Sequence, residues 1–138
     1  MKKNLLFVCR YNRFRSRIAE AYFRKINKNK KIKVKSAGLI KGERLSKGSI
    51  RTAKKFGLNI KGKIQGLSSP IMAWQNIVVI VADDVPPSVF GKNKKYGKKV
   101  IIWKIRDVDE RKKRTADKII KEIIKKVDNL NKQLEKNE

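Results

Sequence analysis

Short runs of apolar residues, separated by segments with helical periodicity, constrain the fold of this chain most. Four runs rich in valine and isoleucine are predicted strands: residues 4–8, 32–35, 77–82 and 100–103. Apolar residues recur at intervals of three and four in three segments that are predicted helices: residues 18–26, 50–56 and 119–134. Strands that alternate with helices favour a parallel sheet covered on both faces. We therefore expect an α/β fold with a four-stranded parallel sheet and helices on both faces.

The chain has the length of one ordinary domain. It contains 138 residues, without an internal repeat or a linker that would divide it. We expect a single domain over residues 1–138, with a frayed end from about residue 134 to 138. No apolar run reaches the roughly 18 residues that would span a bilayer. We read residues 4–8 as a buried strand rather than a secretory signal, and expect a cytoplasmic protein without membrane attachment.

Cysteine and histidine usage narrows the chemistry. Cys9 is the only cysteine, and histidine is absent. This composition excludes an intrachain disulfide and leaves no ordinary zinc site, so we expect neither a metal nor a cofactor. Acid–base chemistry near neutral pH then depends on carboxylates, a thiolate or lysine.

The charge of the chain is strongly positive. There are 38 Lys and Arg residues against 12 Asp and Glu, a formal net charge of +26. Such a charge attracts anions, but it is compatible either with a selected nucleic-acid surface or with lysines that are merely solvated. We expect nonspecific nucleic-acid binding that salt removes, because no basic stripe interleaved with aromatic residues is visible.

A C-x5-R-S motif lies between the first predicted strand and the first predicted helix. It consists of Cys9, Arg10, Tyr11, Asn12, Arg13, Phe14, Arg15 and Ser16. A strand–loop–helix junction aims backbone N–H groups and the positive end of a helix into one concavity, which binds anions. There Cys9 would ionise readily and act as a nucleophile, while Arg15 would grip two phosphate oxygens and stabilise transition-state charge.

The motif also has a purely structural interpretation, without catalysis. Cys9 would then be a small buried apolar residue, and Arg15 one surface base among many. The strand before the motif and the helix after it favour the catalytic interpretation, because the chemistry requires that context.

These features resemble the low-molecular-weight protein tyrosine phosphatase family, whose fold is shared with thioredoxin-coupled arsenate reductases. The resemblance spans nearly the whole chain and rests on the strand into Cys9, Asn12, Arg15-Ser16, Ile18-Ala19-Glu20-Ala21, Ser36-Ala37-Gly38 and Ala82-Asp83. It implies a phosphate-binding loop at the carboxyl edge of the sheet. It also implies that Asn12 holds the loop conformation, that Ser16 donates a hydrogen bond to the Cys9 thiolate, and that Ser36 supports Asn12.

The family also uses an aspartate after the last strand as general acid and then base, and Asp107 is the matching position. A physical argument supports it independently, because a leaving alkoxide or phenoxide needs a proton and no histidine is available. Asp109 is the second candidate. Alternatively, both carboxylates simply pair with Arg106 or Arg111 at the surface.

Several positions depart from the family pattern. Tyr11 replaces a glycine, so the loop would be strained if that position needs a positive φ. Phe14 replaces a second cysteine, and Val108 replaces a proline. The aromatic residues that flank the substrate ring in the family find no match, although Tyr11 can serve as a stacking wall or be an ordinary loop aromatic.

Four further residues receive structural interpretations. Asp83 and Asp84 end the third predicted strand, and we expect them to order the loop. Trp74 and Trp103 adjoin apolar strands and are expected to pack in the core rather than contact substrate.

Three functions remain open. The first is a phosphomonoester hydrolase that acts on a phosphorylated protein, through phosphotyrosine, or on a small aryl phosphate. The second is arsenate reduction, which with Cys9 alone would need an external thiol. The third is a non-catalytic module that binds phosphate groups or polyanions. The oligomeric state stays open.

Overall fold

A computed structural model describes residues 3–60, 62–108 and 113–136. Its centre is one sheet of four strands, namely β1 (Lys3–Cys9), β2 (Ile32–Gly38), β3 (Ile77–Val81) and β4 (Lys99–Trp103). The strand order is β2-β1-β3-β4, and all pairs are parallel. The predicted α/β class with a four-stranded parallel sheet is therefore confirmed.

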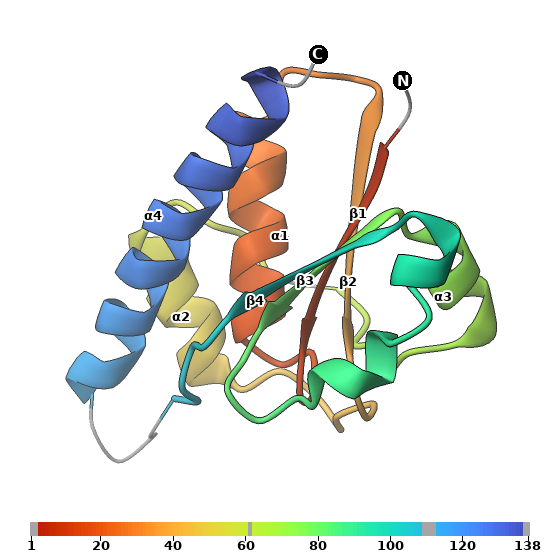
Figure 1. The fold of residues 1–138 in the computed structure, drawn as a ribbon. Coiled ribbons are helices and arrows are strands. Elements are labelled where there is room, and N and C mark those ends of the chain that lie inside the picture. Colours follow the sequence, from red (N-terminus) through yellow and green to blue (C-terminus); the bar gives the residue numbers. More distant parts are fainter. Residues whose placement is uncertain (1–2, 61, 109–112, 137–138) are drawn as a thin grey trace.

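Helices cover both faces of this sheet (Figure 1). They are α1 (Arg15–Ile26), α2 (Lys47–Lys55), α3 (Ser69–Trp74), α4 (Lys113–Lys136) and two short 3-10 helices, η1 (Pro87–Phe90) and η2 (Lys94–Tyr96). Side chains that alternate along β1 explain the two layers, because successive residues of a strand face opposite sides. Leu5 and Phe7 pack in the core shared with α1 and α4, whereas Leu6 and Val8 pack in the core beneath α3 and η1.

A local signal marks the start of α2. The Ser46 side chain accepts a hydrogen bond from the Ser49 N–H and caps this helix. The last helix, α4, continues to Lys136, and Leu134 is buried. Leu134 belongs to the apolar stripe of α4 and packs against the core.

The tryptophans lie where the sequence predicted packing. Trp103 is buried, and its ring centroid lies 6.0 Å from that of Phe7. Trp74 is half-buried against the core beneath α3. No helix within residues 3–60, 62–108 and 113–136 is long and apolar enough to cross a membrane.

Candidate active site

The loop between β1 and α1 forms the floor of the site. Its carbonyl groups at residues 9–11 accept hydrogen bonds from N–H groups of the segment 39–42, at 2.9 to 3.2 Å. Among the described residues, no hydrogen bond is donated by the backbone N–H groups of residues 11–15. A loop with its carbonyls engaged and successive N–H groups free, directly before a helix, is suited to bind an anion.

Gly38, at the end of β2, permits this loop to pack closely. A Cβ atom at residue 38 would lie 2.7 Å from the Tyr11 carbonyl carbon and 2.8 Å from the Asn12 nitrogen. Real Cβ atoms do not approach backbone so closely, and any side chain would displace the loop. The glycine of the Ser36-Ala37-Gly38 segment therefore shapes the site without contacting substrate.

Asn12 holds the most unusual backbone position of the loop. Its φ is 56°, the only positive value at a non-glycine residue in the described chain. Asparagine tolerates this left-handed conformation better than most residues. Tyr11 has no positive φ, so its replacement of the family glycine does not strain the loop in the way that its sequence position suggested.

The Asn12 side chain is fully buried and fully hydrogen-bonded. Its Nδ2 donates to Ser16 Oγ at 2.8 Å and to Ser36 Oγ at 2.9 Å. Its Oδ1 accepts from Arg17 Nη1 at 3.2 Å and from the Gln65 N–H at 3.1 Å. All four hydrogen-bonding positions of the amide are used, which fixes its orientation.

This amide orients the serine beside the cysteine. Cys9 Sγ lies 3.0 Å from Ser16 Oγ. Because Asn12 donates to Ser16 Oγ, the single hydroxyl proton of Ser16 is free to point at the sulfur. On the other side, Ser36 Oγ donates to Glu20 Oε1 at 2.5 Å, which extends the polar chain into α1. The Ser16 hydroxyl is therefore placed to donate a hydrogen bond to the Cys9 sulfur.

Arg15 lies at the carboxyl edge of the sheet among three carboxylates. Its side chain is 2% exposed. Nη1 donates to the Ile105 carbonyl at 2.8 Å and Nη2 donates to Asp84 Oδ1 at 2.9 Å. Asp83 Oδ1 is 3.6 Å from Nη1, and Asp107 Oδ1 is 3.8 Å from Nε. The carboxylates at the end of β3 thus orient the guanidinium that the motif supplies.

Cys9, Arg15 and Asp107 line one cavity of about 280 Å³. The remaining wall is formed by Tyr11, Arg13, Phe14, Ser49 and Val108. The Asp107 carboxylate is 54% exposed and accepts a hydrogen bond from the Val108 N–H at 2.8 Å. Its ion pair among the described residues is with Arg15 rather than with Arg106. Asp109 and Arg111 lie outside the described residues.

Two observations concern the other loop side chains. Tyr11 is 38% exposed and lies beside the Arg10 guanidinium, whose carbon is 5.5 Å from the ring centroid. Phe14 is buried against the core of α1 and α4. Within the described residues, no group of three or more cysteine or acidic side chains is arranged to hold a metal.

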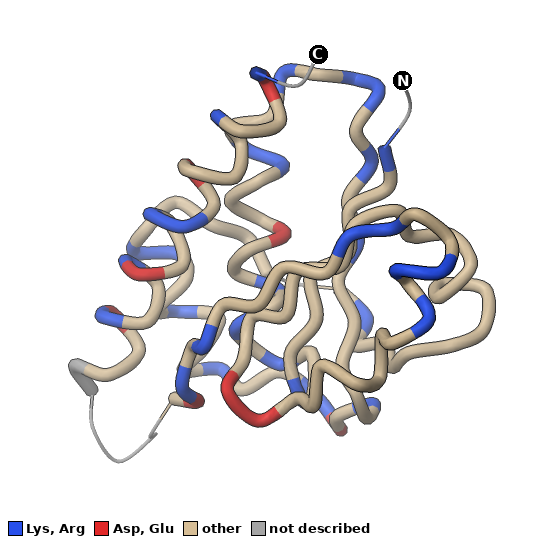
Figure 2. Tube along the Cα trace, in the orientation of Figure 1, with Lys and Arg blue, Asp and Glu red and all other residues tan. Residues whose placement is uncertain are grey.

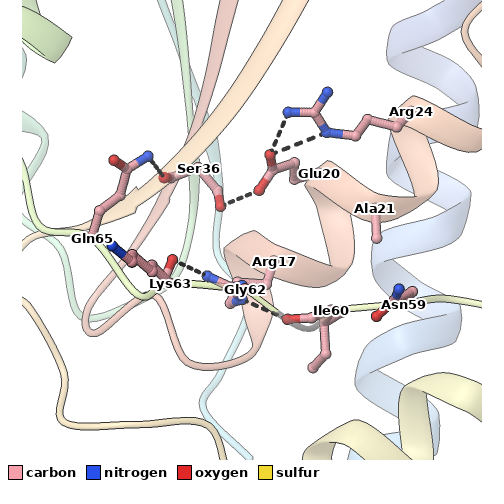
Figure 3. A pocket seen from close by; sticks show the side chains of 10 residues that line it. All are labelled: Arg17, Glu20, Ala21, Arg24, Ser36, Asn59, Ile60, Gly62, Lys63 and Gln65. Carbon is pink, nitrogen blue, oxygen red and sulfur yellow. Dashed lines mark hydrogen bonds and ion pairs between the residues drawn. The ribbon is translucent and has the colours of Figure 1, made fainter.

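Sequence reasoning did not anticipate a second cavity, of about 380 Å³, behind the loop (Figure 3). Arg17 lies in its wall and is 7% exposed. Burial lowers the pKa of the Arg17 guanidinium from its ordinary value, and attraction to Glu20 and Cys9 opposes that shift. Nothing in the sequence distinguishes Arg17 from the many other basic residues.

Residues 4–138 match the sequence profile of the low molecular weight phosphotyrosine protein phosphatase family. The chain belongs to this family. No curated protein sequence matches it.

Solved structures share the fold of this phosphatase family member. The YwlE arginine phosphatase from Geobacillus stearothermophilus is 21% identical with a TM-score of 0.83, over 98% of this chain and 94% of that one. A low molecular weight protein tyrosine phosphatase from T. tengcongensis is 22% identical with a TM-score of 0.81, over 96% and 99%. An arsenate reductase from Archaeoglobus fulgidus is 28% identical with a TM-score of 0.72, over 92% and 98%.

Proposed function

We propose that this family member is a phosphomonoester hydrolase of the tyrosine phosphatase type that forms a cysteinyl phosphate on Cys9. The observation that carries the proposal is the cavity that Cys9, Arg15 and Asp107 share. This reaction needs three groups around one small cavity: a nucleophile, a residue that binds the phosphate and a carboxyl group that transfers a proton.

The first step transfers the phosphoryl group to the protein. The Cys9 thiolate attacks phosphorus, and an S–P bond forms while the P–O bond to the leaving group breaks. Asp107 gives its proton to the leaving oxygen. The free N–H groups of residues 11–15 and the Arg15 fork carry the charge of the equatorial oxygens.

The second step releases phosphate. The Asp107 carboxylate takes a proton from water as the water oxygen attacks phosphorus. The S–P bond breaks and returns the Cys9 thiolate, which the Ser16 hydroxyl at 3.0 Å stabilises. Asp107 is protonated again and ready for the next cycle.

The cavity wall supports an aryl phosphate as substrate, either phosphotyrosine in a protein or a small ester. Tyr11, Phe14 and Val108 line it with apolar or aromatic surface. When the phosphate of such a substrate points to Cys9, its phenyl ring would lie against these side chains. The single free cysteine fits a reducing compartment such as the cytoplasm.

The other two functions have less support. Arsenate reduction would need an external thiol, because Cys9 is the only cysteine and Phe14 occupies the position of the family's second thiol. A non-catalytic phosphate-binding role would leave the shared position of Cys9 and Asp107 without a use. Both alternatives remain distinguishable outcomes of the test.

Rapid quenching of the protein with p-nitrophenyl phosphate tests the proposal. We expect a burst of nitrophenol and one phosphate bound to Cys9, detected by mass spectrometry of the acid-stable peptide. Phosphotyrosine peptides, phosphoarginine peptides and arsenate with an added thiol serve as parallel substrates. Turnover of arsenate alone, or phosphate binding without any turnover, would contradict the proposal.

A further inference from the structure

The guanidinium of Arg17 lies between the phosphate-binding loop and the segment that follows α2. Its Nε donates to the Ile60 carbonyl at 3.0 Å, and its Nη1 donates to the Lys63 carbonyl at 2.9 Å. The same Nη1 donates to Asn12 Oδ1 at 3.2 Å. In Figure 3, Arg17 points away from α1 toward Ile60, Gly62 and Lys63. One planar group therefore bridges three acceptors on two separate segments.

The acceptor on the loop is the residue on which the loop conformation depends. Asn12 carries the positive φ, and its amide orients Ser16 beside Cys9. Gln65, on the same segment as the other two acceptors, donates its N–H to the second lone pair of Asn12 Oδ1. Arg17 and Gln65 together hold the Asn12 side-chain oxygen in place.

The Arg17 guanidinium is buried and is not a solvated surface base. Only 7% of Arg17 is exposed, so its charge has left most of its water. Such burial costs free energy unless the group is hydrogen-bonded. Its three hydrogen bonds to other described residues reach backbone or amide oxygens, and none of these three acceptors is a carboxylate. The Arg17 guanidinium therefore keeps its positive charge, which attracts an anion bound in the phosphate-binding loop.

We propose that Arg17 is a positioning residue of the phosphate-binding loop, which it holds in the anion-binding conformation by bridging Asn12 to the carbonyls of Ile60 and Lys63. The proposal rests on the function proposed above for the same loop. Lysine cannot take over this role, because a single ammonium does not reproduce the planar fork that spans these acceptors.

Three variants test the proposal: Arg17→Met, Arg17→Lys and Arg17→Ala. We expect Arg17→Met to lower kcat for p-nitrophenyl phosphate by about 10- to 100-fold, up to the roughly 10²-fold that a misplacement of about 1 Å in the site can cost. The affinity for inorganic phosphate, measured by calorimetry, should fall with it. Arg17→Lys should resemble Arg17→Met, and recovery by lysine would overturn the bridging role.

The cavity of about 380 Å³ beside Arg17 provides a second test. It gives an added guanidinium ion access to the space that Arg17→Ala leaves. We expect about 50 mM guanidinium chloride, far below the molar concentrations that unfold proteins, to restore part of the lost kcat. Sodium chloride at equal concentration should not. If guanidinium does not restore kcat in Arg17→Ala and this variant has a lower Tm, Arg17 only stabilises the fold. That result would overturn the proposal.

Arg24→Met is the matched control. Arg24 lines the same cavity from the same helix, but it pairs with Glu20 and donates to the Val34 carbonyl. Its loss removes one positive charge without touching the Asn12 bridge, so kcat and phosphate affinity should stay near those of the parent. Equal losses in Arg24→Met and Arg17→Met would show a general charge effect and refute the bridge.

Phosphate binding separates the two proposals. If the parent protein binds phosphate but does not turn over p-nitrophenyl phosphate, the hydrolase proposal fails. A loss of phosphate binding in Arg17→Met, restored by guanidinium in Arg17→Ala, would still support the positioning role. If the parent protein turns over substrate and Arg17→Met keeps its full kcat and phosphate affinity, the positioning role alone fails.

Discussion

Asp84 Oδ1 and Arg15 Nη2 lie 2.9 Å apart at the carboxyl edge of the sheet. Asp84 follows β3, whereas Arg15 begins α1. The ion pair therefore connects the segment after β3 to the start of α1 at the phosphate site. Asp83 is the weaker neighbour, 3.6 Å from Nη1 and 49% exposed. The carboxylate of Asp84 therefore sets the direction of the guanidinium fork.

Asp84→Asn should weaken catalysis more than Asp83→Asn. The amide of the variant keeps the shape of Asp84 but loses the charged acceptor that orients Arg15. We expect kcat/KM for p-nitrophenyl phosphate to fall about tenfold in Asp84→Asn, less than the roughly 10²- to 10³-fold lost when a transition-state donor is removed outright, because Arg15 itself remains. Steady-state kinetics of both variants measure the difference. An equal effect of both substitutions would remove the specific role of Asp84.

Asp107→Asn should slow esters with poor leaving groups far more than esters with good ones. A poor leaving group needs the proton that Asp107 supplies, and such a proton contributes about 10² to 10⁴ in rate. A series of aryl phosphates with different leaving-group pKa values measures this dependence. Asp109→Asn is the matched variant, and leaving-group dependence in Asp109→Asn alone would give the acid role to Asp109.

Cys9→Ser should abolish turnover and keep oxyanion binding. The free N–H groups of residues 11–15 and the Arg15 guanidinium remain in this variant. We expect kcat to fall by roughly 10³-fold or more, as for loss of a nucleophile elsewhere, with phosphate affinity near that of the parent. Calorimetry with phosphate and a nitrophenol assay measure the two quantities. Turnover near the parent rate would exclude Cys9 from the mechanism.

The fold was predictable because its strands are buried on both faces. Buried parallel strands are nearly continuous apolar runs, such as the five residues of β3, Ile77–Val81. The phosphate-binding loop was predictable because Cys9 and Arg15 lie in one short motif, which indicates anion binding without any contact to distant segments. The need for a carboxylic acid at the site followed from the absence of histidine, whereas the choice of Asp107 came from the family resemblance.

Other features depend on contacts between distant segments, which no local pattern records. Helix α3 has only six residues, too few for a helical period to appear. In the sequence Arg17 looks like any other basic residue, and its role appears only once the carbonyls of Ile60 and Lys63 lie against it in the fold. Asp84 acquires its role because β3 ends beside β1, a consequence of the strand order.

The Tyr22 hydroxyl donates to Asp128 Oδ1 at 2.7 Å and ties α1 to α4. This hydrogen bond, with burial and the carboxylate charge, raises the pKa of Tyr22 to about 12. Because the folded protein holds the phenol proton more tightly, the bond stabilises the fold fully below pH about 10, the ordinary tyrosine pKa. That stabilisation is lost as the pH rises through about 12.

Tyr22→Phe should therefore lower the free energy of unfolding by about 1 kcal/mol at neutral pH, the net value of a typical intramolecular hydrogen bond, because solvent screens the carboxylate charge of this partly exposed pair. The difference from the parent should shrink between pH about 10 and about 12. Urea unfolding of both proteins across this range measures it, and taking the difference cancels the titration of the lysines. A gap that widens with pH would contradict the assignment.

A basic groove lies along β2 and the turn after α1, where Figure 2 shows several Lys and Arg positions. Its volume is about 740 Å³, and every charged residue of the described chain that lines it is basic: Arg24, Lys28, Lys30, Lys33 and Lys35. Trp74 is its aromatic member. The sequence did not reveal this groove, because Trp74 reaches it from α3.

The groove should bind nucleic acid weakly and lose it near physiological salt. Lys35 Nζ lies 4.4 Å from the Trp74 ring centroid, so it covers the face on which a base would stack. Only phosphate contacts remain, and the roughly 8 Å Debye length at 0.15 M salt screens diffuse attraction. Each contact with single-stranded DNA contributes about 0.7 to the slope of log affinity against log salt.

Fluorescence titration with single-stranded DNA at several salt concentrations tests this prediction. The double variant Lys33→Glu/Lys35→Glu should lower the slope by about 1.4, the loss of two contacts. Lys125→Glu/Lys132→Glu, on the exposed face of α4, changes the net charge equally and should lower the slope less. Because each pair of substitutions removes the same charge, only a localised groove predicts a difference between them. Equal slopes for the two double variants would show that binding is spread over the whole +26 surface. Sub-micromolar binding that survives at about 0.15 M salt would contradict the prediction, because it requires close contacts beyond diffuse attraction.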